Sequence, residues 1–96
     1  MSVYVDPLRE YGGSKTFPWK VSCHMWADSL ADLHAMAVAI GMKRAWFQDK
    51  PDFPHYDLVA TKRKRAVELG AVEVDRATMV EYVRRRRGEA LTERLF

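Results

Sequence analysis

The sequence predicts a small α/β domain in which a sheet of three to four strands packs against about three helices. Its 96 residues fit one domain with one modest core. The composition, 48% hydrophobic and 30% charged, is typical of a globular protein. Strand-like segments take turns with helix-like segments, and two strand–helix–strand units in succession favour a sheet covered by helices. We therefore expect one domain over residues 1–88, followed by a tail over residues 89–96 that extends the last helix, docks or frays.

Two strands are expected in the N-terminal third. Val3 and Val5 alternate with polar residues up to Asp6, and Pro7 ends the strand. A polar connection over residues 7–20 follows, and ordered loops of this length are uncommon and often functional. Residues 21–28 alternate again. We expect Val21, Cys23, Met25 and Ala27 on the core face and Ser22, His24, Trp26 and Asp28 on the other face.

The middle of the chain is expected to form a helix, a strand and a loop. Ser29 is a favourable N-cap and Gly41 suits the position after the last turn, which predicts a helix over residues 30–40. Residues 44–48 alternate and are interpreted as a third strand. A second loop occupies residues 49–57. Its last residues are His55, Tyr56 and Asp57.

The C-terminal third is expected to hold two helices around a short strand. The first helix runs from about residue 58 to residue 69, with Arg63 on its apolar side. Residues 72–74 form the short strand. Asp75 then caps a last helix that ends at Gly88.

Charge is distributed unevenly along the chain. The net charge is +3, but residues 61–96 carry ten basic and six acidic residues, mainly because of basic runs at 62–65 and 84–87. This asymmetry favours a phosphate-bearing partner, either a nucleotide or nucleic acid. The alternative is a solvated helix face, since successive helical residues point about 100° apart.

The sequence also excludes some classes of protein. No apolar run approaches the roughly 20 residues of a membrane helix, and the N-terminus lacks the basic and apolar regions of a signal peptide. The single cysteine, Cys23, cannot form an internal disulfide or a cysteine-rich zinc site. We expect a cytoplasmic protein without a membrane partner.

Polar side chains are expected to converge at one edge of the predicted sheet. Ligands of open α/β sheets bind beyond the carboxyl ends of the strands. Asp6 and Asp28 end two of the predicted strands, and the loop over residues 49–57 leads back to the same edge. The residues expected to meet there are Asp6, His24, Asp28, His55 and Asp57, with Arg63 beside them.

Three chemistries suit such a cluster. In the first, which we favour, it binds a phosphorylated small molecule or a nucleic-acid backbone without a cofactor. The ligand-binding residues would be His24, Arg44, His55, Tyr56, Asp57, Lys62 and Arg63. In the second, Asp6, Asp28 and Asp57 hold Mg²⁺ or Mn²⁺ in a metal-dependent nuclease or phosphodiesterase. In the third, the histidines act as general acid and base, so that the catalytic candidates are Asp6, His24 and His55.

These residues also have structural interpretations. An aspartate before a helix is often only an N-cap, as Asp28 and Asp57 would be. Arg63 would then form a structural salt bridge with Asp57. Trp26 and Trp46 would belong to the core or to an interface, so a protein-interaction module, including a homo-oligomer, is a third class of function.

Three segments carry a further pattern, VYVD, CHMWADSLADLHAMAVAIGMKRAWFQ and HYDLVATKRKRAVELGAVEV. Their order and spacing resemble a family of short bacterial and phage proteins known as a domain of unknown function. The resemblance covers about residues 1–74 and leaves the arginine run and the tail outside it. It places the polar residues of the family on Asp6, His24, Asp28, His34, Arg44, Gln48, His55, Tyr56, Asp57, Lys62 and Arg63. It implies a bacterial or phage origin and an intracellular setting, and it supplies no activity.

Overall fold

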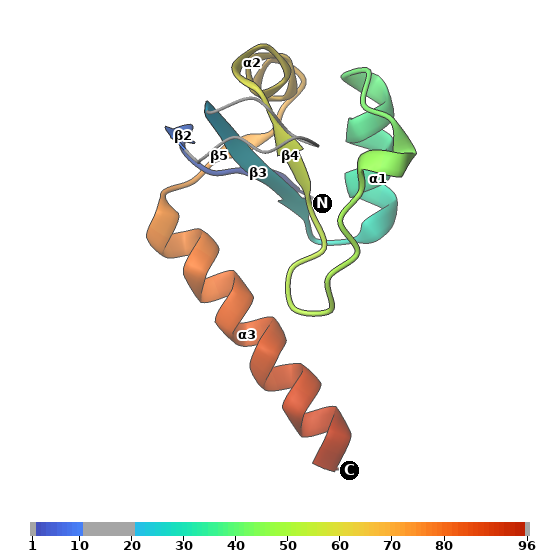
Figure 1. Cartoon of the computed structure of the whole chain (residues 1–96), viewed down its shortest axis with the longest axis vertical. Coiled ribbons are helices and arrows are strands. Elements are labelled where there is room, and N and C mark those ends of the chain that lie inside the picture. The colour runs from blue at the N-terminus through green and yellow to red at the C-terminus, as the bar shows by residue number, and fades with distance from the viewer. Residues whose placement is uncertain (1, 11–20, 96) are drawn as a thin grey trace.

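The computed structural model describes residues 2–10 and 21–95, with residues 89–95 described by their backbone alone. Helices lie on both faces of a central sheet (Figure 1). In chain order the elements are β1 (Val3–Val5), β2 (Arg9–Glu10), β3 (Val21–Ala27), α1 (Leu30–Ala39), the 3₁₀-helix η1 (Arg44–Trp46), β4 (Tyr56–Leu58), α2 (Ala60–Glu68), β5 (Val72–Glu73) and α3 (Arg76–Leu95). Most of the predicted loop over residues 7–20 lies outside the described residues. None of the helices described is both long enough and apolar enough to cross a membrane.

The sheet has five strands and is built around β3. β3 pairs in antiparallel fashion with β1, β2 and β4, and β1 pairs in parallel with β5. β4 and β5 therefore run in the same direction and form a strand–helix–strand unit with α2. The predicted α/β class is confirmed. The short β2, which lies within the predicted first loop, takes the sheet beyond the three to four strands expected.

The larger core lies between the sheet and the helices α1 and α2. The alternation of β3 points Cys23, Met25 and Ala27 into this core, as predicted. Val21, at the start of the strand, is instead 47% exposed. The helices contribute Leu33, Ala37, Ile40 and Ala66, and the other strands contribute Val3, Val5, Tyr56 and Leu58. Burial of these apolar side chains fixes both helices against one face of the sheet.

Ser29 begins α1, as the sequence predicts. Its Oγ accepts a hydrogen bond of 3.1 Å from the backbone N–H of Asp32, one of the donors that the first turn leaves without a helical partner. Replacing Ser29 with alanine is expected to lower the free energy of unfolding by about 1 kcal/mol, measured by urea denaturation. Ser29→Asp keeps the acceptor and should retain nearly all of the stability. An equal loss in both variants would contradict the capping role.

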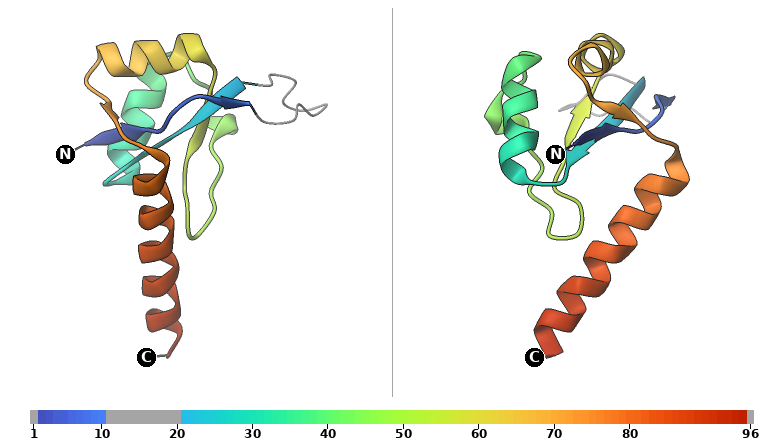
Figure 2. Two further views of the ribbon diagram at one scale, coloured as in Figure 1. Left: turned by 90° about the vertical axis from the view of Figure 1, so that its left-hand side faces the viewer. Right: turned by 180° about the vertical axis from the view of Figure 1, so that it is seen from behind.

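A second, smaller core lies on the opposite face of the sheet, against α3. It consists of Trp26, Phe53 and Met79, with Tyr4, Val74, Tyr82 and Val83 packed around them. Farther along α3, Arg87 forms an ion pair of 2.8 Å with Asp52 in the loop between η1 and β4. Beyond these contacts the helix projects away from the sheet (Figure 2).

Residues 44–48 do not form the predicted strand. Their first part is the 3₁₀-helix η1, and Gln48 makes only an isolated bridge with His55. β3 is already paired with β1 on one side and with β4 on the other, and this segment pairs with the sheet only through the single bridge to His55, just before β4. The alternation has a different cause, because Phe47 packs against the core whereas Trp46 is 49% exposed.

The predicted start of the second helix is also wrong. Residues 56–58 form β4, and α2 begins at Ala60. Tyr56 and Leu58 are both fully buried. Because side chains two residues apart share a face only in extended backbone, a strand buries both of them and a helix would not.

The last helix does not end at Gly88 as predicted. α3 continues to Leu95. Of the three expectations for the tail, residues 89–95 therefore extend the last helix. A single glycine in a helix interior costs only about 1 kcal/mol and does not by itself end the helix.

Candidate metal centre

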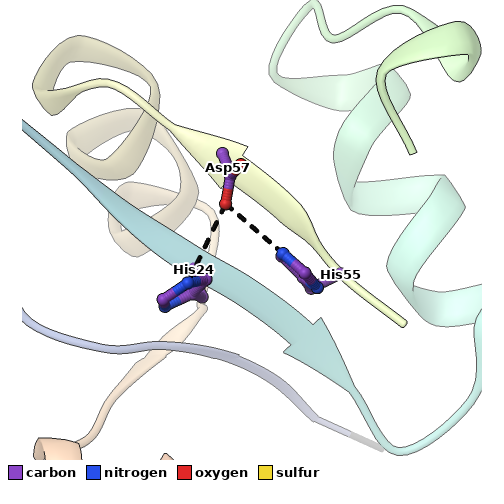
Figure 3. Close-up of side chains that lie close together, drawn as sticks. All are labelled: His24, His55 and Asp57. Carbon is purple, nitrogen blue, oxygen red and sulfur yellow. Dashed lines mark ion pairs between the residues drawn. The ribbon is translucent and has the colours of Figure 1, made fainter. Parts of the chain in front are cut away.

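Four polar side chains meet on the face of the sheet that α1 and α2 leave uncovered. The register of β1 and β3 brings Asp6 opposite His24, and the Asp6 backbone N–H bonds to the His24 carbonyl at 3.3 Å. On the other edge of β3, β4 places Asp57 opposite His24. His55 lies two residues before Asp57 and points to the same face (Figure 3). The alternation of side chains across paired strands thus builds the cluster.

Asp6 fixes the orientation of His24. The Asp6 side chain is 1% exposed, and its two oxygens accept hydrogen bonds from the backbone N–H of His24 at 2.6 Å and from its Nδ1 at 2.8 Å. A carboxylate only accepts hydrogen bonds, so Nδ1 carries the proton. The other ring nitrogen, Nε2, then faces the cluster, 4.0 Å from Asp57 Oδ1.

His55 is oriented in the same way by the backbone. Its Nδ1 lies 2.6 Å from the carbonyl oxygen of Phe53, which can only accept, so the proton is again on Nδ1. The Phe53 ring stacks on the imidazole at 4.4 Å between centroids and fixes its plane. Nε2 of His55 therefore faces Asp57 Oδ1 at 3.4 Å, where it donates to the carboxylate when the ring is doubly protonated and offers its lone pair when the ring is neutral.

Asp57 completes the cluster as a carboxylate. Burial opposes its ionisation, but the hydrogen bonding and charge of His55, a hydrogen bond from Gln48 Nε2 and the charge of His24 outweigh burial, so the pKa of Asp57 lies below its ordinary value. Its side chain is 28% exposed and that of His24 is 20% exposed. The cluster is therefore accessible to solvent beside Asp57 and His24.

These three residues form a potential metal site. Two imidazole nitrogens and one carboxylate oxygen, from His24, His55 and Asp57, lie within 4.8 Å of one another. Two histidines with one carboxylate suit Zn²⁺, Fe²⁺ and related divalent ions, and three protein ligands leave a position for water. Each proposed ligand also has a hydrogen-bond partner outside the cluster. His24 bonds to Asp6, His55 to the Phe53 carbonyl and Asp57 to Gln48. Such outer-sphere hydrogen bonds are typical of ligands in metalloproteins.

The structure does not bring all three predicted metal aspartates together. Asp6 lies behind His24 with both oxygens engaged. Asp28 lies four residues farther along the chain than His24, roughly 13 Å in a strand. Its oxygens accept from the Ser2 backbone N–H at 3.0 Å and the Tyr4 hydroxyl at 2.9 Å. Because β1 and β3 are antiparallel, their carboxyl ends lie at opposite ends of the strand pair. Asp6 and Asp28 therefore cannot lie in one site.

The predicted phosphate-binding cations contact other groups. Arg44 lies over the ring of Phe47, 4.8 Å from its centroid. Lys62 Nζ donates to the Ile40 carbonyl at 2.9 Å, at the end of α1. Arg63 donates to the Asp6 carbonyl and pairs with Glu73, both at 2.9 Å, rather than with Asp57. Arg63 therefore ties α2 to the ends of β1 and β5.

Tyr56 and Cys23 face the core rather than the cluster. The Tyr56 hydroxyl bonds at 2.9 Å to Nδ1 of His34, so the third histidine of the chain lies on the α1 side of the sheet. Burial raises the pKa of the Cys23 thiol to about 12, with a further contribution from the charge of Asp6. A buried thiol with this pKa is not a nucleophile.

Two supporting groups were not assigned by sequence reasoning. Gln48 was interpreted as a strand end, and its bond to Asp57 depends on the bridge with His55. The Phe53 carbonyl carries no signal, because every residue has a carbonyl group. The His–x–Asp pair at 55 and 57 is the available signal, since in a strand both side chains point to one face.

The fold and the cluster define a small α/β protein with a histidine–carboxylate centre on the open face of its sheet. Residues 3–86 match the family described as protein of unknown function DUF4031, and the chain belongs to this family. The resemblance stated above is thereby confirmed, and the match reaches beyond residue 74 into the arginine run. No curated protein and no solved structure matches the chain.

Proposed function

We propose that this protein binds one divalent transition-metal ion through His24, His55 and Asp57 and uses it to activate water for the hydrolysis of a phosphate ester. The observation that carries the proposal is the convergence of three ligand atoms within 4.8 Å. Each of the three side chains is oriented by a hydrogen bond to a group outside the cluster. In both histidines Nδ1 bonds to an acceptor, so Nε2 is the nitrogen that faces the cluster and would bind the metal. Histidines that served only to stabilise the fold would not need to share this orientation.

The donor set favours a transition metal over the Mg²⁺ suggested by the sequence. Mg²⁺ prefers oxygen ligands, and this cluster offers two nitrogens and one carboxylate. An ion held by three protein groups retains water, and the metal lowers the pKa of that water towards neutrality. Solvent reaches the cluster beside Asp57 and His24, as hydrolysis requires.

A phosphate ester is the proposed substrate class because a metal ion bound at the cluster would neutralise the charge of a phosphate. The C-terminal third carries the basic excess of the chain. Arg44, Lys62 and Arg63 are engaged elsewhere, so the positive charge at the cluster would come from the metal ion itself. The anion binding favoured by the sequence and the metal-dependent hydrolysis kept as its alternative thereby become a single function.

The test is a titration of the metal-stripped full chain with Co²⁺ and Zn²⁺. We expect one ion per chain by calorimetry, visible Co²⁺ absorption typical of a four- or five-coordinate site, and metal-dependent hydrolysis of bis(4-nitrophenyl) phosphate. His24→Ala should lose all three signals. His34→Ala is the matched control, because His34 is hydrogen-bonded to Tyr56 on the α1 side, and it should retain them.

Two results would contradict the proposal. One is a stripped wild-type chain that binds neither ion, and the other is equal loss in the His34 and His24 variants. Metal binding without hydrolysis would retain the metal site and overturn the catalytic part. Far-ultraviolet circular dichroism of each variant establishes that the chain is folded.

A further inference from the structure

A groove separate from the metal centre lies between the first turns of α3 and the end of the β1–β3 pair. Its volume of about 510 Å³ is in the range of small-molecule sites. Residues of both strands and of α3 line it, including Tyr4, Trp26 and Tyr82. The sequence predicts a metal ligand at Asp28, a core or interface position for Trp26 and a helix cap at Asp75, and it predicts no groove in this region.

Aromatic rings form one wall of the groove. The Tyr4 and Trp26 rings stack with centroids 5.9 Å apart, and Tyr82 lies 5.8 Å from Trp26 on the other side. Trp26 is 2% exposed and is held rigidly, whereas the two tyrosines are half-buried. Ring faces of this kind attract cations and pack against methylene chains.

The polar lining of the groove is mainly acidic. It contains three carboxylates, Asp28, Asp75 and Glu81, and one guanidinium, Arg85, which lies 3.7 Å from Glu81. The whole chain is basic, with a net charge of +3. The net charge of the groove lining is therefore negative, whereas that of the whole chain is positive. A cation would be attracted by the local carboxylates and not by the overall charge of the protein.

Two of the three carboxylates, Asp28 and Asp75, are held in place by hydrogen bonds. Asp28 accepts from the Ser2 backbone N–H and the Tyr4 hydroxyl. Oδ1 of Asp75 accepts from the backbone N–H of Thr78 at 2.8 Å and from its hydroxyl at 2.7 Å, and these bonds hold the pKa of Asp75 below its ordinary value. Each carboxylate has about four acceptor positions, so both retain acceptors for a ligand.

We propose that this groove binds a small organic cation that carries alkylammonium groups on a methylene chain, such as a linear polyamine. Ammonium N–H groups would donate to the carboxylates, and the methylene chain would pack on the aromatic wall. The proposal does not depend on the metal centre. Trp26 and Phe53, whose rings lie 5.6 Å apart, fill part of the space between the two sites.

The test is calorimetry of the full chain with spermidine in metal-free buffer. Spermidine should bind once per chain, and glutarate, an opposite-charge probe of similar size, should not bind. Glu81→Gln should weaken spermidine binding by about tenfold, the effect of losing one charge-assisted hydrogen bond. Glu68→Gln makes the same change on α2, at an exposed position outside the groove, and should leave the affinity unchanged.

Asp28→Asn is the second variant. Its oxygen keeps the bond from the Ser2 N–H and its amide group can donate to the Tyr4 hydroxyl, but it removes one negative charge from the groove, and it should also weaken binding. The proposal is overturned if spermidine fails to bind, if glutarate binds equally well, or if the groove variants bind spermidine like the Glu68 control. Metal titration of the same variants separates this result from the proposed function, because neither substitution touches His24, His55 or Asp57.

Discussion

Replacing Asp6 with asparagine is expected to weaken metal binding by about 10–100-fold although all three proposed ligands remain. Oδ2 of the carboxylate accepts from Nδ1 of His24 and holds the proton there, while Oδ1 accepts from the His24 backbone N–H. An asparagine has one oxygen, which would keep the bond to the backbone N–H. Its amide group would then donate to Nδ1, so the proton would move to Nε2 and occupy the position where the metal binds.

Asp28→Asn is the matched control for this prediction. Asp28 also accepts from one backbone N–H and one side chain, but at the opposite edge of the β1–β3 pair. Calorimetric titration with Zn²⁺ should give a weakened affinity for Asp6→Asn and the wild-type affinity for Asp28→Asn. A wild-type affinity in the Asp6 variant would show that Asp6 does not position His24 for a metal.

Sequence reasoning predicted the faces of β3 because alternation is a local property. Cys23 and Met25 fell on the core side and His24 and Trp26 on the other side without any knowledge of neighbouring strands. The same rule gives His55 and Asp57 a common face once residues 56–58 are recognised as a strand. The chemical identity of the cluster was therefore accessible from the sequence.

The neighbours of each strand were not accessible from the sequence. The expectation that Asp6 and Asp28 meet assumed that their strands end at the same edge, and the antiparallel pairing of β1 with β3 separates them. Pairing direction depends on contacts between distant segments, and no pattern within either strand reports it. The same pairing placed Asp6 beside His24, which changes its proposed role from metal ligand to positioning residue.

Charge runs were the least informative part of the sequence. Arg63 was expected near the cluster on account of its helical face, but the direction of its side chain is set by the Asp6 carbonyl and Glu73. Arg87 pairs with Asp52 from a distant part of the chain. Long side chains reach partners several ångströms from their backbone, so a position on a helix face does not identify the partner.

Trp26→Ala is expected to produce the largest loss of stability, about 3–5 kcal/mol. Trp26 is 2% exposed and contacts Tyr4, Phe53 and Tyr82 at centroid distances of 5.9, 5.6 and 5.8 Å. Trp26, in β3, thus connects three other parts of the structure: β1, the loop before β4 and α3. In a chain of this size each kcal/mol shifts the melting temperature by about 4–8 °C, so thermal unfolding should show a decrease of roughly 15–30 °C.

Trp46→Ala makes the same substitution at a site that is 49% exposed, and the expected change is within about 1 kcal/mol. Urea denaturation of both variants separates the loss of a core contact from a general effect of removing tryptophan. Because Phe53 stacks on His55 and contacts Trp26 edge to face, the Trp26 variant should also weaken metal binding, whereas the Trp46 variant should not. A Trp26 variant as stable as the Trp46 variant would mean that α3 is held to the sheet by contacts other than this aromatic cluster.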